Sequence, residues 1–301
     1  MKETEKQKIL QAGKICSKVK KWIDDSNLVK PGIKLLDIAE AIENKIIELG
    51  GKPAFPVNTS INEIAAHYTP SFNDESIASG LLKVDFGVHV DGFVADNAMS
   101  FDLENSEENK KLISASVEAL NQVLKKIKPK ITTSEIGKTI QETIESKGFI
   151  PIINLSGHSI EEYELHSGIT IPNVSITNEH SVELEEGVYA IEPFVTLNSG
   201  SGKVYDGKPS GIYQLRDFKN VRSPSAREVL NFINDEYGNL PFCSRWLHKK
   251  FGTKAILSLR ELENTDCLHQ YTQLIESSKS KVAQAEHTIL IEKDKVTVTT
   301  I

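Results

Sequence analysis

Two aspartates lie in a strand-like segment, KVDFGVHVDGFVADNAMS at residues 83–100. The dipeptide Asp91-Gly92 between β-prone runs predicts a hairpin, because both turn residues tolerate positive φ. A two-residue loop there pairs Gly87 with Asp96, and side-chain alternation then places Asp85 and Asp96 on one face as diagonal neighbours. Two negative charges would repel each other there, and a cation between them would reverse that cost. The hairpin alone fits a cation site and a solvated face with scattered acids equally well.

Three further groups, His158, Glu192 and Glu286, lie on strand-like segments or at their edges. Each glutamate interrupts an apolar run, where an unpartnered buried carboxylate costs on the order of several kcal/mol. His158 alone fits an ordinary, partly buried histidine. With the hairpin aspartates, however, the set holds four carboxylates and one imidazole, which suit Mn²⁺, Co²⁺, Fe²⁺ or Zn²⁺ rather than a thiolate zinc site. Four carboxylates exceed the need of one ion, so they predict two ions, about 3.5 Å apart, able to hold a hydroxide between them.

An internal repeat indicates how these segments are positioned. Residues 30–53 and 128–151 align without a gap at an offset of 98, and eight of the 24 positions are identical. Helical periodicity explains part of this match, but the shared Lys-Pro and glycine positions are harder to explain in that way. Ile15 and Val19 also align with Ile113 and Val117 in the preceding helix. The repeat predicts an α+β protein of two related halves, each a helix pair plus strands, with a site between them.

Two more histidines nearly follow this repeat. His67, in NEIAAHYTP, and His166, in YELHSGITIP, are 99 residues apart. Near-equivalent histidines of two related halves could face one another across a cleft. The alternative is that each is an exposed histidine on a loop.

Amphipathic helices are predicted at about residues 5–24 and 37–49, the second ending at Gly50-Gly51. In the second half, residues 188–195 form a predicted strand. Its return strand is predicted only at residues 285–292.

Between these two strands, residues 198–210 resemble a loop, and the pattern is helical from Ser223 to about Ser280. We therefore predict a mostly helical insert in the loop of the second hairpin. The predicted domains are a catalytic domain, residues 1–197 and 281–301, and the insert, residues 198–280.

The composition narrows the class of protein. The chain has 301 residues, 39% of them hydrophobic and 26% charged, with a net charge of −7, which argues against binding nucleic acid through its phosphates. Three isolated cysteines favour a reducing compartment. The N-terminus lacks the apolar core of a signal peptide, and no run approaches the roughly 18 apolar residues of a membrane span. A cytoplasmic protein that does not contact membranes is expected.

Five motifs occur in order along most of the chain, and together they resemble those of the methionine aminopeptidases. They are VDFGVHVDGFVAD, NLSGH, LHSGITIPN, YAIEPF and QAEHTI. The resemblance implies the duplicated α/β architecture called the pita-bread fold. The long insert, including the segment NLPFCSRWL, resembles the type II class, and the lack of an N-terminal extension resembles its archaeal members.

The resemblance also implies roles for individual residues. Asp85, Asp96, His158, Glu192 and Glu286 would hold two divalent ions (Co, Mn, Fe or Zn), with Asp96 and Glu286 bridging them. His67 would contact the scissile amide region, and His166 would donate a hydrogen bond to the substrate carbonyl oxygen. Glu192 would carry the proton to the leaving amine. Positions that line the methionine pocket correspond to Phe55, Pro56, Asn58, Leu165 and Phe194.

The chain departs from the family pattern at one position next to a predicted ligand. Ser159 follows His158 where the family usually has glycine. If that backbone required positive φ, serine would be strained there. The change removes no ligand, so we expect at most a tuning effect.

The function implied is metal-dependent removal of the N-terminal methionine from nascent polypeptides whose second residue is small. Two alternatives remain: an Xaa-Pro aminopeptidase or prolidase on the same fold, and a non-catalytic binding protein that has lost the metals. A monomer is the expected state. The sequence leaves contact with the ribosome and the purpose of the insert open.

Overall fold

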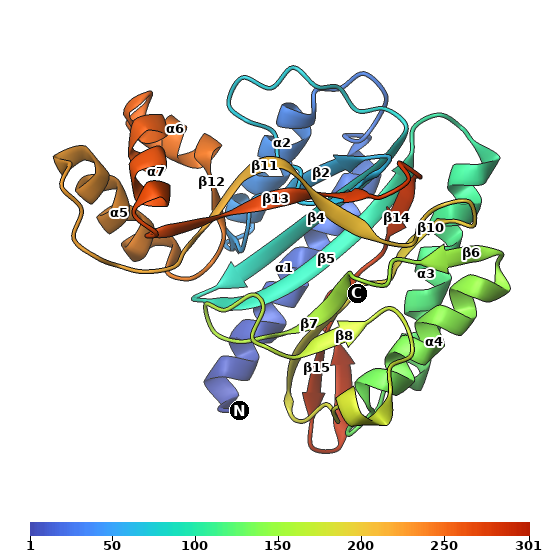
Figure 1. Ribbon diagram of the computed structural model, residues 1–301. Coiled ribbons are helices and arrows are strands. Elements are labelled where there is room, and N and C mark those ends of the chain that lie inside the picture. Colours follow the sequence, from blue (N-terminus) through green and yellow to red (C-terminus); the bar gives the residue numbers. More distant parts are fainter.

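The computed structural model describes residues 1–301, the side chain of Asn178 excepted. The first half of the chain forms a helix pair against a long hairpin (Figure 1). In chain order its elements are α1 (Glu3–Ser26), α2 (Leu35–Glu48), β1 (Lys52–Pro53), β2 (Asn58–Ile61), β3 (Ile64–Ala66), β4 (Leu81–Val90) and β5 (Phe93–Asp102). Strand β4 pairs with β1, β2 and β5 in one sheet, and α1 packs along β4 and β5.

The β4–β5 hairpin has the predicted turn and register. Gly87 pairs with Asp96, and Asp91 and Gly92 have φ values of 48° and 87°. Asp85 and Asp96 line the same cavity. The alternation of side chains along paired strands therefore brings the two carboxylates to one face, as the sequence predicted.

The second half repeats the helix pair and the sheet. Its elements are α3 (Glu107–Lys126), α4 (Thr133–Ser146), β6 (Phe149–Pro151), β7 (Ser156–Ile160), β8 (Thr170–Pro172), the 3₁₀ helix η1 (Asn178–His180), β9 (Gly187–Ile191), β10 (Phe194–Leu197), β14 (Val282–Gln284), β15 (His287–Glu292) and β16 (Lys295–Val298). One sheet has the order β16-β15-β9-β7-β8, and another has the order β14-β10-β6. Strands β9 and β15 are antiparallel neighbours, so the predicted second hairpin exists with its return strand about 95 residues later.

The internal repeat corresponds to two separate cores. Ile42 is buried in the core between α1, α2 and β4, and its repeat partner Ile140 is buried in the core of α3, α4, β9 and β15. The match fails at Val117, which is 43% exposed whereas its partner Val19 is buried. The repeat therefore marks one supersecondary unit used twice, since the aligned isoleucines of α2 and α4 bury equivalent faces.

The insert contains more strand than the sequence predicted. Its elements are β11 (Val204–Leu215), α5 (Pro224–Tyr237), β12 (Phe242–Cys243), α6 (Ser244–Phe251), α7 (Lys254–Asn264) and β13 (Leu268–Glu276). The helices lie at one end of the β11–β13 ribbon (Figure 1). The loop predicted at residues 198–210 was wrong from Val204 onward. The helical pattern predicted up to Ser280 was wrong for residues 268–276.

Irregular pairing explains why this ribbon was missed. The β11–β13 register shifts on both sides of Pro209, and such bulges interrupt the alternation by which strands are predicted. Strand β13 also pairs with β3 of the first half, through Leu274 opposite Ala66. This ribbon thus joins the insert to the rest of the protein. The division of the chain into two domains at residues 198 and 280 stays a prediction.

Candidate active site

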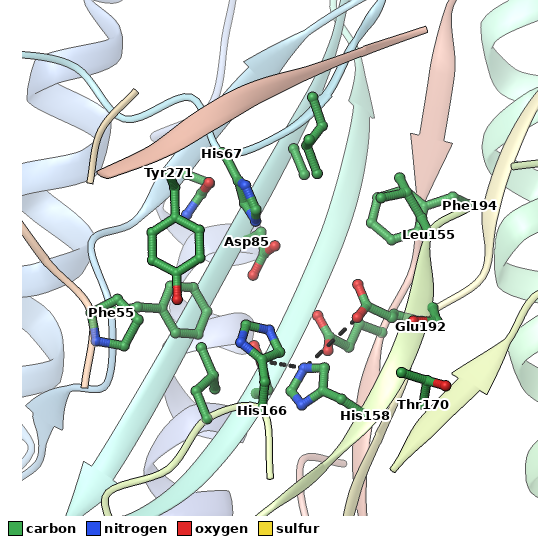
Figure 2. Close-up of a pocket in the computed structure, with 18 of the residues that line it drawn as sticks. Phe55, His67, Asp85, Leu155, His158, His166, Thr170, Glu192, Phe194 and Tyr271 are labelled. Carbon is green, nitrogen blue, oxygen red and sulfur yellow. Dashed lines mark ion pairs between the residues drawn. The ribbon is translucent and has the colours of Figure 1, made fainter. Parts of the chain in front are cut away.

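A cavity of about 360 Å³ is lined by residues of both halves and of the insert (Figure 2). The five predicted metal ligands all line it. They lie on β4, on β5, on β7, directly after β9 and directly before β15. In that order they are Asp85, Asp96, His158, Glu192 and Glu286.

The imidazole of His158 lies between carboxylates. Its Nε2 atom is 3.7 Å from Asp96 Oδ2 and 3.7 Å from Glu192 Oε1. Donor atoms of Asp96, His158 and Glu286 all lie within 4.8 Å of one another. This spacing would allow several donors to reach one ion.

The buried carboxylates repel one another. Burial raises the pKa of Asp85 to about 7. Burial, with the negative charge of Asp85 added, raises the pKa of Asp96 well above its usual value. Burial and the neighbouring carboxylates likewise raise the pKa of Glu192 and of Glu286. The protein alone therefore disfavours the ionised forms, and a bound divalent cation would favour them.

Unpartnered acceptor atoms indicate where a cation would fit. Asp85 Oδ1, Asp96 Oδ1 and Glu286 Oε1 are buried without a hydrogen-bond donor among the described residues. Gln284 Nε2 donates weakly to both Asp85 Oδ2 and Glu192 Oε2, at 3.3 Å each. Buried carboxylate oxygens without donors suit a hard or borderline divalent ion, so the donor set fits the metal centre that the sequence predicted.

Two strands from different halves are bonded together behind these carboxylates. The Asp96 N–H donates to Thr288 Oγ1 at 2.7 Å, and the Thr288 hydroxyl donates to the Asp96 carbonyl at 2.8 Å. The Glu286 N–H donates to the Ala98 carbonyl at 3.1 Å. One hydroxyl thus satisfies both main-chain groups of Asp96 and fixes β5 against β15.

The two further histidines also line the cavity, as Figure 2 shows. His67 has a φ of 63°, its Nδ1 lies 3.2 Å from the Thr272 carbonyl oxygen, and its ring meets Tyr271 edge-on at 5.4 Å. The His166 ring lies 4.3 Å from that of His158. His67 is partly buried directly after β3, so it is not an exposed loop histidine. His166 is exposed and lies in the loop between β7 and β8, as the alternative supposed, but it still lines the cavity.

Desolvation within the cavity lowers the pKa of each of these imidazoles and keeps them neutral. It lowers the pKa of His158 to about 4. Desolvation of the imidazole within the cavity, together with the nearby His158 and His67, lowers the pKa of His166 to about 3. Burial also lowers the pKa of His67. A neutral imidazole can ligate a metal through one nitrogen or donate one N–H bond.

The predicted pocket residues do not all reach the cavity. Phe55, Asn58, Leu165 and Phe194 line it. Pro56 is buried beside the lining, where its carbonyl oxygen accepts a hydrogen bond from Asn58 Nδ2 at 2.8 Å. Three of the four lining residues are apolar, so this part of the cavity suits an apolar side chain.

Sequence reasoning missed the part of the cavity that the insert supplies. Tyr271 on β13 and Ile212 on β11 line the cavity, and the Tyr271 hydroxyl donates to Gln214 Oε1 at 2.8 Å. Recognising 268–276 as a strand is the one signal that could have identified Tyr271. Without that ribbon, nothing local placed either residue near the histidines.

Ser159 is not strained. It lies in the extended strand β7 opposite Tyr189, so the concern about positive φ was wrong. Its hydroxyl accepts hydrogen bonds from the Ser167 hydroxyl at 2.8 Å and from the Ile169 N–H at 3.0 Å. The residue that departs from the family pattern therefore supports the loop that carries His166.

Within the described residues, no helix combines the length and apolar character needed to cross a membrane.

The chain is similar to known proteins over nearly its full length. The model of metallopeptidase family M24 matches residues 7–293. A methionine aminopeptidase of Methanocaldococcus jannaschii is 47% identical over 296 residues, covering 98% of each chain. Among solved structures, a thermophilic Arx1 has a TM-score of 0.83 at 18% identity, over 99% of this chain and 91% of that one. A methionine aminopeptidase of Thermotoga maritima has a TM-score of 0.71 at 24% identity, over 100% and 98%.

The two solved structures show the fold alone, which is the pita-bread fold predicted from the sequence. The curated relatives and the family model identify the group. The chain therefore belongs to metallopeptidase family M24, and within it to the methionine aminopeptidases.

Proposed function

We propose that this protein removes the N-terminal methionine from nascent polypeptides by hydrolysing the Met-Xaa bond where Xaa is small. The observation that carries the proposal is the convergence of five candidate ligands and two neutral histidines on one cavity with an apolar side. The group to which the chain belongs supplies the reaction class.

The candidate metal ligands would be Asp85, Asp96, His158, Glu192 and Glu286, holding two divalent ions drawn from Co, Mn, Fe and Zn. Bound ions of this kind lower the pKa of a water molecule and so supply a nucleophile near neutral pH.

The chain's own residues would bind the substrate and move the proton. His166, whose lowered pKa keeps it neutral, would donate an N–H bond to the carbonyl oxygen and stabilise the negative charge that develops there. Glu192 would receive the proton of the attacking water and deliver it to the leaving amine. His67 lies on another wall of the cavity and would contact the scissile amide.

The cavity wall would select the side chain. Phe55, Leu165 and Phe194 are buried, apolar lining residues. An unbranched, polarisable thioether fits such a surface well. Three buried free cysteines are consistent with action in the reducing cytoplasm.

The test is release of free methionine from Met-Ala-Ser by metal-stripped protein, with and without added Co²⁺ or Mn²⁺. Metal-dependent release is expected. Cleavage of an Xaa-Pro peptide instead would favour the prolidase-type alternative, which the comparisons support less. A folded protein with neither bound metal nor turnover would be the non-catalytic homologue.

A further inference from the structure

The insert segment NLPFCSRWL carries two side chains that reach back into the first half of the protein. Arg245 on α6 forms a two-point ion pair with Glu43 on α2, with Nη1–Oε2 at 2.7 Å and Nη2–Oε1 at 2.8 Å. The Trp246 indole N–H donates to Glu43 Oε2 at 2.9 Å. Arg245 is 3% exposed and Glu43 is 6% exposed, so this cluster is buried between the insert and α2.

The same charged groups also hold the main chain of two segments beside the cavity. The Val57 N–H donates to Glu43 Oε1 at 3.2 Å. Arg245 Nε donates to the Pro70 carbonyl oxygen at 3.0 Å. The two segments are joined in turn, because the Thr69 hydroxyl donates to the Val57 carbonyl oxygen at 2.9 Å.

Both segments carry residues that line the cavity. Val57 lies between Phe55 and Asn58, and Pro70 follows His67 by three residues. His67 has a φ of 63°, and a non-glycine residue keeps such a conformation only where its surroundings enforce it. A fixed carbonyl at Pro70 and a fixed N–H at Val57 provide such surroundings.

Stability alone is a weak reason for this arrangement. A buried ion pair adds little net stability compared with apolar residues of similar volume. What the pair supplies is a defined orientation, because a planar guanidinium and a carboxylate meet through two parallel hydrogen bonds. Glu43 also accepts hydrogen bonds from Trp246 Nε1 and the Val57 N–H.

We propose that Glu43, Arg245 and Trp246 form a brace that positions the cavity wall made by Phe55, Asn58 and His67. They act as positioning residues: the brace sets where the substrate side chain and scissile amide lie, and leaves metal binding largely unchanged. This inference rests on the proposed function. The inference also assigns a role to the insert, because its helix α6 supplies the Arg245 guanidinium of the brace.

The test compares the wild-type protein with the double variant Glu43→Leu/Arg245→Met. This variant removes both charges together, so neither partner of the pair is left buried and unpaired. Its thermal midpoint is expected to fall, because the Val57 N–H, the Trp246 indole N–H and the Pro70 carbonyl oxygen lose their partners. The kinetics are therefore measured well below that midpoint. The KM for Met-Ala-Ser should rise by about tenfold or more, because small misplacements of substrate are costly. The kcat should change less than KM, and Mn²⁺ affinity of metal-free protein, measured by calorimetry, should stay within about threefold.

A matched control uses another ion pair across the same boundary. Lys52 and Glu236 meet at 2.7 Å between β1 and α5, with side chains 57% and 40% exposed. Glu236→Gln should leave KM unchanged, because an exposed ion pair contributes little free energy and does not fix the segments that it joins. Trp246→Phe serves if the double variant fails to fold. It removes one donor to Glu43 and should raise KM by a smaller factor.

A folded double variant with the wild-type KM would overturn the brace. An equal increase in the KM of Glu236→Gln would also overturn it. A loss of Mn²⁺ affinity that accounts for the lost activity would also overturn it. No release of methionine by the wild-type protein would overturn the proposed function and the brace together, so the two failures are distinguishable.

Discussion

The main chain and the side chain of Asp96 make different kinds of contact. Its main-chain groups are both bonded to Thr288, whereas its Oδ1 atom is buried without a donor. The main-chain bonds of Asp96 are therefore structural, whereas its carboxylate is available for function. The main chain fixes the strand, and the carboxylate is free to bind a cation.

Asp96→Ala is therefore expected to abolish methionine release while the protein stays folded. The substitution keeps both main-chain bonds to Thr288 and removes a carboxylate that burial and Asp85 make costly to ionise. Methionine release and the thermal midpoint of metal-free protein are the two measurements. Full activity in this variant would contradict the assignment of Asp96 as a ligand.

His166→Ala is expected to lower kcat by about 10²–10³-fold, as loss of one donor to a developing oxyanion does. Steady-state kinetics with Met-Ala-Ser measures the effect, and metal content should not change. An unaltered kcat would remove the role proposed for His166.

At the scale of elements, the strand β7 and the loop that follows it act together. The Ser159 hydroxyl on β7 accepts hydrogen bonds from the Ser167 hydroxyl and the Ile169 N–H. These two residues follow His166 in the loop. Ser159 differs from the usual family residue, and in the structure its hydroxyl supports the loop that carries His166.

Ser159→Ala should lower kcat by about two- to fivefold, since a lost hydrogen bond is worth on the order of 1 kcal/mol. Ser159→Gly is the matched comparison, because it removes the same hydroxyl and also restores the usual family residue. Equal effects of the two variants would assign the loss to the hydroxyl. A kcat at or above the wild-type value in both variants would refute the supporting role of the Ser159 hydroxyl.

For the whole molecule, the carboxylates of the candidate metal centre couple the free energy of unfolding to pH. The carboxyl pKa of Asp85 is about 7 in the folded protein, against a usual value of 3.8. Between these values the folded state binds more protons than the unfolded state. The contribution of Asp85 to the stability of metal-free protein is therefore lost as pH rises from about 4 to about 7. The lowered pKa values of His158 and His166 contribute in the opposite direction.

A divalent ion offsets the same repulsion, so its stabilising effect should grow over that interval. Thermal midpoints of metal-free protein, with and without Mn²⁺, are measured at several pH values. The increase on adding Mn²⁺ is expected to be small near pH 4 and largest above pH 7. An equal increase at both ends would show that these carboxylates do not hold the ion.

The sequence by itself determined the β4–β5 hairpin and the two-fold reuse of a helix pair. A two-residue turn fixes the register of its strands, and a period-two pattern then fixes the faces of Asp85 and Asp96. The isoleucine spacing of α2 and α4 fixed their buried faces in the same way. These are local properties, so short stretches of sequence contain them.

Only the tertiary structure decided how the insert completes the cavity. Tyr271 reaches the cavity because bulged β11 pairs with β13, and β13 pairs with β3 about 200 residues earlier. The Glu43–Arg245 pair joins residues that are likewise 202 positions apart. Such contacts depend on long-range pairing and packing, which no local period reveals. The strands that carry the candidate ligands could therefore be predicted from the sequence, while the part of the cavity wall that the insert supplies could not.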